Sequence, residues 1–182
     1  MMRKMLLVVL YTAFAAGANV GVANAGSVDG LLLGDMKKLA LVDPEAVPAE
    51  VLLDGEGMET GLDQYRGKWI VLNFWATWCA PCRKEMPALQ RLADAMPEIA
   101  VVPVATGRND VGQIVKFYGE AGVTSLPVLR DPKSGLAHQM GVMGLPVTLI
   151  INPQGQEVAR LIGDAEWDSV QAQAVLRAMM AE

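Results

Sequence analysis

Three stretches of apolar and β-branched residues stand out along the chain as candidates for buried strands. They cover residues 69–75, 99–105 and 147–151. Each stretch is nearly continuous in hydrophobicity rather than alternating, which is typical of strands that are buried on both faces of a sheet. The pattern therefore predicts a central sheet with helices on its two sides.

The first of these strands leads into a predicted helix over residues 80–95. Met86, Leu89 and Leu92 recur at spacings that place them on one side of that helix. Pro87 predicts a kink, because a proline inside a helix removes a backbone hydrogen-bond donor.

Two later helices are predicted from their capping residues. The earlier one covers about residues 109–120, with Asn109 as its N-cap and Gly122 closing it. The final helix is expected to open at Asp164 or Glu166. Its core-facing side chains are predicted to be Val170, Ala174, Val175 and Ala178.

Turn signals place a hairpin on each side of this region. Residues 51–60 carry an Asp-Gly turn, and an Asn-Pro-Gln-Gly turn joins the strand at 147–151 to a returning strand over 156–162. A short extended segment at 128–129 and a short helix at 134–140 complete the pattern. The order strand, helix, strand, helix, hairpin, helix predicts an α/β sandwich with a mixed sheet.

The N-terminus has the features of an export signal. Residues 1–25 begin with positive charges at Arg3 and Lys4, continue in an apolar run and end in Ala-Asn-Ala. That order is typical of a secretory signal peptide that is cleaved after Ala25. An uncleaved membrane anchor over residues 5–25 is the alternative. Both interpretations place the rest of the chain outside the cytoplasm.

Residues 26–48 are interpreted as a tether that contains one short helix. A loose apolar stripe from Asp29 to Val42 predicts that helix, and Asp43-Pro44 is expected to end it. With the hairpin that follows, it would form an N-terminal extension of the fold. The folded domain is expected to cover residues 49–182.

The charge balance excludes two kinds of partner. The chain has 15 Lys and Arg against 20 Asp and Glu, a formal charge of −5. Loss of residues 1–25 removes two basic and no acidic residues, which leaves a charge of −7. An acidic chain is repelled by nucleic acid and by anionic membrane surfaces, so neither is expected as a partner. The same acidic, single-domain character favours a monomer.

Cys79 and Cys82, the two cysteines of the chain, carry the strongest chemical signal. They lie where the predicted strand ends and the helix over 80–95 begins. Free N–H groups and the helix dipole stabilise a thiolate there. Helical spacing brings both sulfurs to one face, and Pro81 stiffens the turn between them. The pattern predicts a redox-active dithiol in which Cys79 attacks a substrate disulfide and Cys82 resolves the mixed disulfide.

Metal binding fits the sequence less well. Structural zinc needs four ligands, and the only histidine, His138, is expected to be a solvated helix residue. Two thiolates suit Cu(I), with Met140 and Met143 as the candidate additional ligands. No metal or cofactor is predicted, and a non-enzymatic Cu(I)-binding carrier is the alternative.

Three motifs occur together along the chain. Residues 69–82 read WIVLNFWATWCAPC, Pro87 follows the second cysteine after five positions, and residues 144–148 form a Gly-x-Pro-x-Thr turn. This combination resembles the TlpA/ResA group of thioredoxin-like thiol:disulfide oxidoreductases, and the stretch GDAEW at 163–167 is most similar to its TlpA members. The resemblance implies a thioredoxin-like three-layer α/β/α sandwich with a central mixed sheet.

The resemblance also implies roles for individual residues. Pro146 would be a cis-proline that faces the dithiol, and the backbone of Leu145 would pair with an extended substrate segment. Trp78 would pack beside Cys79 and form part of the substrate surface, together with Pro81.

A proton acceptor for the resolving cysteine follows from the same comparison. Cytosolic thioredoxins carry a buried Asp where this chain has Asn73, and an amide cannot accept the proton of Cys82. In the TlpA/ResA group the active-site acid falls on Glu85, which shares a helix face with Cys82. We expect Glu85 to take that proton; the alternative is an exposed first-turn glutamate that merely suits the helix dipole.

Members of this group are exported reductants, which implies a periplasmic protein-disulfide reductase. Implied substrates are a Sco-type copper chaperone or an oxidase subunit, with a membrane electron donor of the DsbD or CcdA kind. Val147 stands where cytochrome c maturation thioredoxins carry Glu, which weakens the alternative of a cytochrome c maturation reductase. A DsbA-type oxidase is disfavoured, because the segment between Cys82 and Leu145 is too short for an inserted helical domain.

Overall fold

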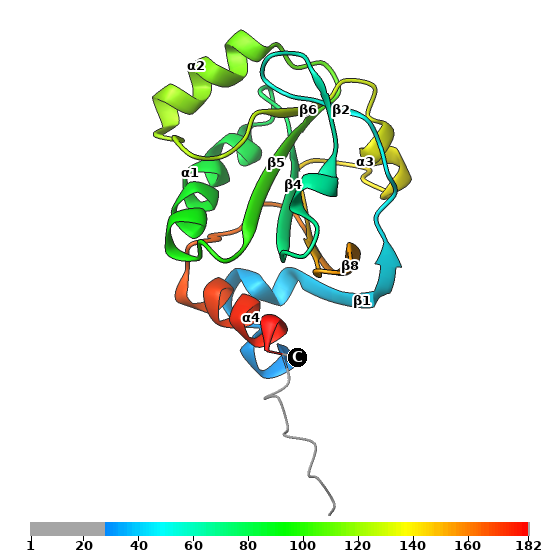
Figure 1. Ribbon diagram of the computed structural model, residues 1–182. Coiled ribbons are helices and arrows are strands. Elements are labelled where there is room, and N and C mark those ends of the chain that lie inside the picture. The colour runs from blue at the N-terminus through cyan, green and yellow to red at the C-terminus, as the bar shows by residue number, and fades with distance from the viewer. Residues whose placement is uncertain (1–27, 182) are drawn as a thin grey trace, which may run out of the picture.

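The computed structural model describes residues 28–181, and within them eight strands form one mixed sheet (Figure 1). The predicted signal peptide or membrane anchor lies outside the described residues. The strands are β1 Leu39–Ala46, β2 Leu52–Leu53, β3 Glu59–Thr60, β4 Ile70–Trp75, β5 Ala100–Thr106, β6 Leu129–Asp131, β7 Val147–Ile151 and β8 Gln156–Ile162. They lie side by side in the order β1-β8-β7-β4-β5-β6-β2-β3.

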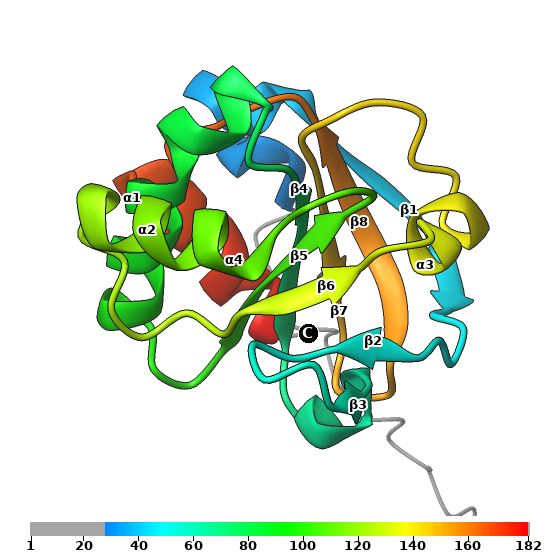
Figure 2. The ribbon, with the colours of Figure 1, turned by 90° about the horizontal axis from the view of Figure 1, so that it is seen from above.

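Helices cover both faces of this sheet (Figure 2). On one face lie α1 (Ala80–Ala95), α2 (Val111–Ala121) and α4 (Val170–Met180). The short helix α3 (Gly135–Gln139) lies on the other face. The predicted three-layer α/β/α sandwich with a mixed sheet is therefore confirmed.

Strand β4 separates two apolar cores, because its successive side chains point to opposite faces. Val71 and Trp75 belong to the cluster beneath α1, α2 and α4, whereas Leu72 and Phe74 belong to the cluster beneath α3. Asn73 is fully buried and points toward α1. A polar side chain in the middle of a buried strand needs a specific partner there.

The pairing of β4 brings distant segments to one edge of the sheet. β4 runs parallel to β5 and antiparallel to β7, with Phe74 opposite Val147. The end of β4, where α1 begins, therefore lies beside the start of β7. The turn that carries Cys79 and the segment that carries Pro146 meet at this edge.

The helix predicted over Asp29–Val42 is wrong. The chain forms two short 3₁₀ turns, η1 (Val28–Leu31) and η2 (Gly34–Lys38), and then strand β1, which pairs antiparallel with β8. Without β1, the backbone groups of β8 would face an open sheet edge. Pro44 lies at a register irregularity of β1, where its missing N–H is tolerated, so it does not end the element. Residues 39–46 thus belong to the sheet rather than to a tether.

Helix α2 begins one residue later than predicted. Its N-cap is Asp110, whose carboxylate accepts a hydrogen bond of 3.1 Å from the backbone N–H of Gln113. Asn109 is not the cap, because its side chain is engaged by another loop. Gly122 ends the helix at a φ of 69°, as predicted.

Helix α4 also begins later than predicted. Its N-cap is Ser169 rather than Asp164 or Glu166, because the connection before it packs against α1 in a non-helical conformation. Val170 was predicted to face the core and is 75% exposed, which is wrong, whereas Val175 is fully buried as predicted.

The remaining elements agree with the sequence pattern. Helix α1 has the predicted bounds, with Pro87 inside it, and the strands β4, β5 and β7 overlap the three apolar stretches. The hairpins β2–β3 and β7–β8 are both present. Within residues 28–181, none of the helices has both the length and the apolar character that a membrane span requires.

Candidate active site

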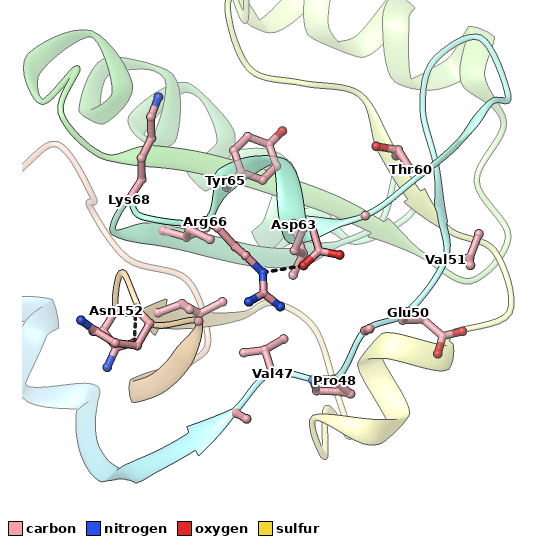
Figure 3. A pocket seen from close by; sticks show the side chains of 18 of the residues that line it. Val47, Pro48, Glu50, Val51, Thr60, Asp63, Tyr65, Arg66, Lys68 and Asn152 are labelled. Carbon is pink, nitrogen blue, oxygen red and sulfur yellow. Dashed lines mark hydrogen bonds and ion pairs between the residues drawn. The ribbon is translucent and has the colours of Figure 1, made fainter.

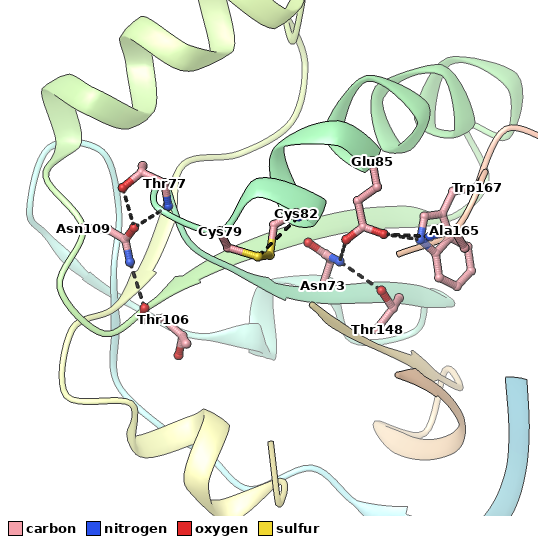
Figure 4. The surroundings of a disulfide bond; sticks show 10 residues. All are labelled: Asn73, Thr77, Cys79, Cys82, Glu85, Thr106, Asn109, Thr148, Ala165 and Trp167. Atoms are coloured by element: carbon pink, nitrogen blue, oxygen red, sulfur yellow. Dashed lines mark hydrogen bonds between the residues drawn. A yellow bond between two sulfur atoms is a disulfide. The ribbon is translucent and has the colours of Figure 1, made fainter. Parts of the chain in front are cut away.

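A disulfide joins Cys79 and Cys82 at the point where β4 ends and α1 begins (Figure 4). The two Cα atoms are 5.3 Å apart. Cys79 is the N-cap of α1, and its sulfur accepts a hydrogen bond of 3.3 Å from the backbone N–H of Cys82. Donors at this helix end stabilise negative charge on Cys79 once the disulfide is reduced.

The two sulfurs differ in access to solvent. Cys79 is 6% exposed, whereas Cys82 is fully buried. Cys79 is therefore the more accessible of the two sulfurs. This asymmetry supports the predicted order of attack, which stays a prediction.

An apolar rim borders the disulfide. Trp78, next to Cys79, is 68% exposed, and Pro81, between the two cysteines, is also exposed; Met143, at 95% exposure, lies three residues before Pro146. The Leu145–Pro146 peptide bond is cis, which is the geometry that the resemblance implies, and it directly precedes β7. Exposed apolar side chains beside a reactive group are typical of a docking surface.

Glu85 lies one helical turn beyond Cys82, and it is buried rather than exposed, at 3% exposure. Its Oε1 accepts a hydrogen bond of 2.9 Å from Asn73 Nδ2. Its Oε2 accepts hydrogen bonds of 3.2 Å from the backbone N–H of Ala165 and from the indole N–H of Trp167. Three donors from two distant segments thus hold the carboxyl group (Figure 4).

Burial raises the pKa of Glu85 from 4.5 to about 7. The hydrogen bonds from Asn73, Ala165 and Trp167 stabilise the carboxylate and oppose this rise, whereas the nearby charge of Asp164 adds to it. A carboxyl group with this pKa exchanges a proton readily near neutral pH.

A second polar contact holds the loop that carries the cysteines, and sequence reasoning missed it. Asn109 Oδ1 accepts from the backbone N–H of Thr77 at 2.8 Å and from its hydroxyl at 3.0 Å. Asn109 Nδ2 donates to the carbonyl of Thr106 at 2.8 Å. The side chain therefore ties the turn before Trp78 to the end of β5 (Figure 4). Asn109 carried only a capping signal in the sequence, because its true partner is 32 positions away.

The candidate metal ligands are dispersed. Met140 is buried in the cluster beneath α3, whereas Met143 lies on the surface near the start of β7. His138 is exposed on α3, as predicted for a solvated residue. Among residues 28–181, no three His, Cys, Asp or Glu side chains gather as metal ligands would.

A pocket of about 550 Å³ (Figure 3) is partly lined by Ile70, at the start of β4, and therefore lies at the end of this strand that is opposite the disulfide. Val47, Tyr65 and Lys68 contribute to its lining, as does an ion pair of 2.7 Å between Arg66 and Asp63. Neither cysteine lines this pocket. The disulfide instead lies beside exposed apolar side chains such as Trp78, which suits a protein segment better than an enclosed small molecule.

Comparison with known sequences gives consistent matches. The family model described as AhpC/TSA family matches residues 44–159. The chain is 33% identical over 120 residues to the thiol-disulfide oxidoreductase ResA of Geobacillus thermodenitrificans, which covers 66% of this chain and 69% of that protein. It is 32% identical over 130 residues to ResA of Bacillus subtilis, which covers 69% and 70%.

Solved structures of other proteins share the fold of this chain. A protein described as a thiol:disulfide interchange protein DsbE from Chlorobium tepidum superposes with a TM-score of 0.65 at 25% identity, covering 78% of this chain and 98% of that chain. The exposed lipoprotein thioredoxin Etrx1 of Streptococcus pneumoniae superposes with a TM-score of 0.60 at 27% identity, covering 71% and 99%. The fold is thioredoxin-like.

Proposed function

Since the chain belongs to the AhpC/TSA family and, within it, to the ResA-type thiol-disulfide oxidoreductases, we propose that it reduces disulfides of specific exported proteins in the periplasm. One observation supports this most. A disulfide at a helix N-terminus lies between an exposed apolar rim and a buried carboxyl group. The rim suits a protein substrate, and the carboxyl group suits proton transfer.

The first step uses the reduced protein. The Cys79 thiolate attacks one sulfur of a substrate disulfide, so that a bond from Cys79 to that sulfur forms and the substrate disulfide breaks. The second substrate sulfur leaves as a thiolate and takes up a proton from solvent. Trp78, Pro81 and the backbone of Leu145 hold the substrate segment against Cys79 in this step.

The second step returns the protein to the oxidised state described here. Cys82 passes its thiol proton to the Glu85 carboxylate, and its sulfur attacks Cys79. The Cys79–Cys82 disulfide forms while the bond from Cys79 to the substrate breaks, and the released substrate sulfur takes up a proton. Two electrons have then passed from the dithiol to the substrate. Glu85 can serve as this acceptor because its pKa of about 7 leaves it partly ionised near neutral pH.

A further donor must supply two electrons to reduce Cys79–Cys82 again. A membrane carrier of the DsbD or CcdA kind suits this role, because the periplasm has no thiol buffer of its own. A Sco-type copper chaperone or an oxidase subunit is the proposed substrate. Apocytochrome c, the substrate of a cytochrome c maturation reductase, is the competing one.

Two measurements test the function. The reduction potential of the dithiol, measured against glutathione, should lie well below the value of about −120 mV of a strong oxidant. A potential near that value would make the protein an oxidase. In Cys82→Ser, a mixed disulfide should accumulate on Cys79, and its mass identifies the substrate. Cys79→Ser is the control that should trap nothing.

A further inference from the structure

Asn73 has an amide oxygen that accepts no hydrogen bond within the part of the chain that the structure describes. The side chain is fully buried in the middle of β4. Its Nδ2 donates to Glu85 Oε1 at 2.9 Å and to Thr148 Oγ1 at 3.0 Å, which uses both amide hydrogens. Among the described residues, Asn73 Oδ1 accepts no hydrogen bond. A buried acceptor without a donor is unfavourable, so its presence at this position calls for a physical reason.

The position of Asn73 identifies a donor for this oxygen. Cys82 and Glu85 are three residues apart on α1 and share the face that packs on β4. Figure 4 shows the Asn73 amide between them, with its nitrogen toward Glu85 and Thr148 and its oxygen on the side of the disulfide. In the oxidised protein the sulfur of Cys82 carries no hydrogen. In the reduced protein it does.

We propose that Asn73 is a positioning residue for the resolving cysteine, with its Oδ1 accepting a hydrogen bond from the Cys82 thiol while its Nδ2 holds Glu85. The proposal rests on the assignment of Cys82 and Glu85 made above. Reduction by two electrons and two protons breaks the Cys79–Cys82 bond and gives Cys82 its S–H. That hydrogen then fills the one open position on the Asn73 amide.

Two consequences follow from this arrangement. The reduced protein gains a hydrogen bond that the oxidised protein lacks, so Asn73 favours the reduced state. The same amide keeps the thiol of Cys82 and the carboxylate of Glu85 on opposite edges of one rigid planar group. The thiol hydrogen therefore leaves Asn73 Oδ1 before it passes to Glu85, when the sulfur of Cys82 turns to attack the mixed disulfide on Cys79.

The reduction potential separates this role from a merely structural one. Asn73→Leu keeps the size of the side chain and removes both the acceptor and the donor. We expect the equilibrium constant for reduction by glutathione to fall about tenfold, which is about 30 mV for this two-electron couple. The matched control is Gln90→Leu. Gln90 is a buried polar residue of α1 whose Oε1 accepts from the backbone N–H groups of Thr124 and Ser125, away from the disulfide. The reduction potential of Gln90→Leu should match that of the parent protein.

A second measurement covers the case in which Asn73→Leu does not fold. In Cys79→Ala the single thiol is Cys82, and its S–H stretching band in the infrared should lie at the lower frequency of a hydrogen-bonded thiol. A band at the frequency of a free thiol would overturn the proposal, and so would a potential of Asn73→Leu equal to that of Gln90→Leu. Failure of Cys82→Ser to trap a mixed disulfide would instead contradict the proposed function and leave both of these readouts unaffected.

Discussion

The indole N–H of Trp167 donates to the carboxyl group of Glu85 over 3.2 Å, although 82 positions separate the two residues. Trp167 is fully buried in the connection that precedes α4. Together with the N–H of Ala165, it holds Oε2 and limits the rise in the pKa of Glu85 that burial causes. A residue far from the cysteines in sequence thus adjusts the group proposed to take their proton.

Trp167→Phe should raise the pKa of Glu85 further. The variant removes one donor to the carboxylate, and a hydrogen bond to a charged group is worth about 1.5–3 kcal/mol, which corresponds to about one to two pKa units. A carboxyl titration by ¹³C NMR measures the change. Trp75→Phe is the matched control, because the buried Trp75 indole donates to no partner among residues 28–181. Equal pKa values in the two variants would contradict the assigned role of Trp167.

Glu85→Gln should slow the resolving step roughly 100-fold at pH 7, which is within the range for loss of a general base. In the parent protein the rate should rise through about pH 7 as Glu85 ionises, and the variant should lose this inflection. Single-turnover kinetics of the mixed disulfide on Cys79 follow the step directly. A rate–pH profile that the substitution leaves unchanged would exclude Glu85 as the acceptor.

The stability of the oxidised protein should fall between about pH 4.5 and pH 7. The pKa of Glu85 is raised in the folded state, from 4.5 to about 7, so the folded protein holds this proton more tightly than the unfolded chain. The contribution of Glu85 to the free energy of unfolding is therefore fully present below the pKa of the unfolded chain. This contribution, about 3 kcal/mol, is lost as pH rises through the pKa of the folded protein. Urea unfolding across this range measures the loss. In Glu85→Gln the fall should be smaller by that amount.

Asn109→Ala should destabilise the protein by about 1–2 kcal/mol, because the two donors of Thr77 lose their acceptor. Amide hydrogen exchange of Thr77 and Trp78 should also speed up, since their loop is released from the end of β5. Asp110→Ala is the control: it removes the cap of α2 at a comparable cost and leaves the Thr77 contact in place. Similar exchange in both variants would mean that Asn109 does not hold this loop.

Trp78→Ala should weaken binding of protein substrates without changing the dithiol. An exposed aromatic side chain at the centre of an interface contributes enough to raise KM about tenfold when it is truncated. The reduction potential should stay at its parent value, because Trp78 makes no hydrogen bond to either sulfur. Val170→Ala, at another exposed apolar residue, should leave KM unchanged. An unaltered KM in Trp78→Ala would remove Trp78 from the substrate surface.

The sequence alone predicted the elements whose signals are local. The continuous hydrophobicity of residues 69–75 predicts a strand that is buried on both faces, and β4 is buried throughout. The periodicity of residues 80–95 predicts α1 with the observed bounds. Cys79 and Cys82 are three residues apart at a strand-to-helix junction, and that spacing alone brings their sulfurs together. Each of these features depends on neighbours within about four positions.

Only the tertiary structure decided the surroundings of Glu85. The sequence left open whether this side chain is an exposed first-turn glutamate or a buried acid. Its burial comes from Asn73 on β4 and from Ala165 and Trp167 before α4, which no local pattern connects to α1. Desolvation by these distant segments is the cause of the raised pKa, so the chemistry of the carboxyl group follows from packing rather than from its place in the helix.

Competition between hydrogen-bonding partners explains two of the predictions that were wrong. Asn109 satisfies the rule for a helix cap, but the donors of Thr77 engage its side chain, and Asp110 caps α2 instead. The apolar stripe that predicted a helix extends to Val42, yet the open edge of β8 recruits residues 39–46 as a strand. In both cases a hydrogen-bonding group that is distant in sequence outweighs a local preference worth only a fraction of a kcal/mol to about 1 kcal/mol.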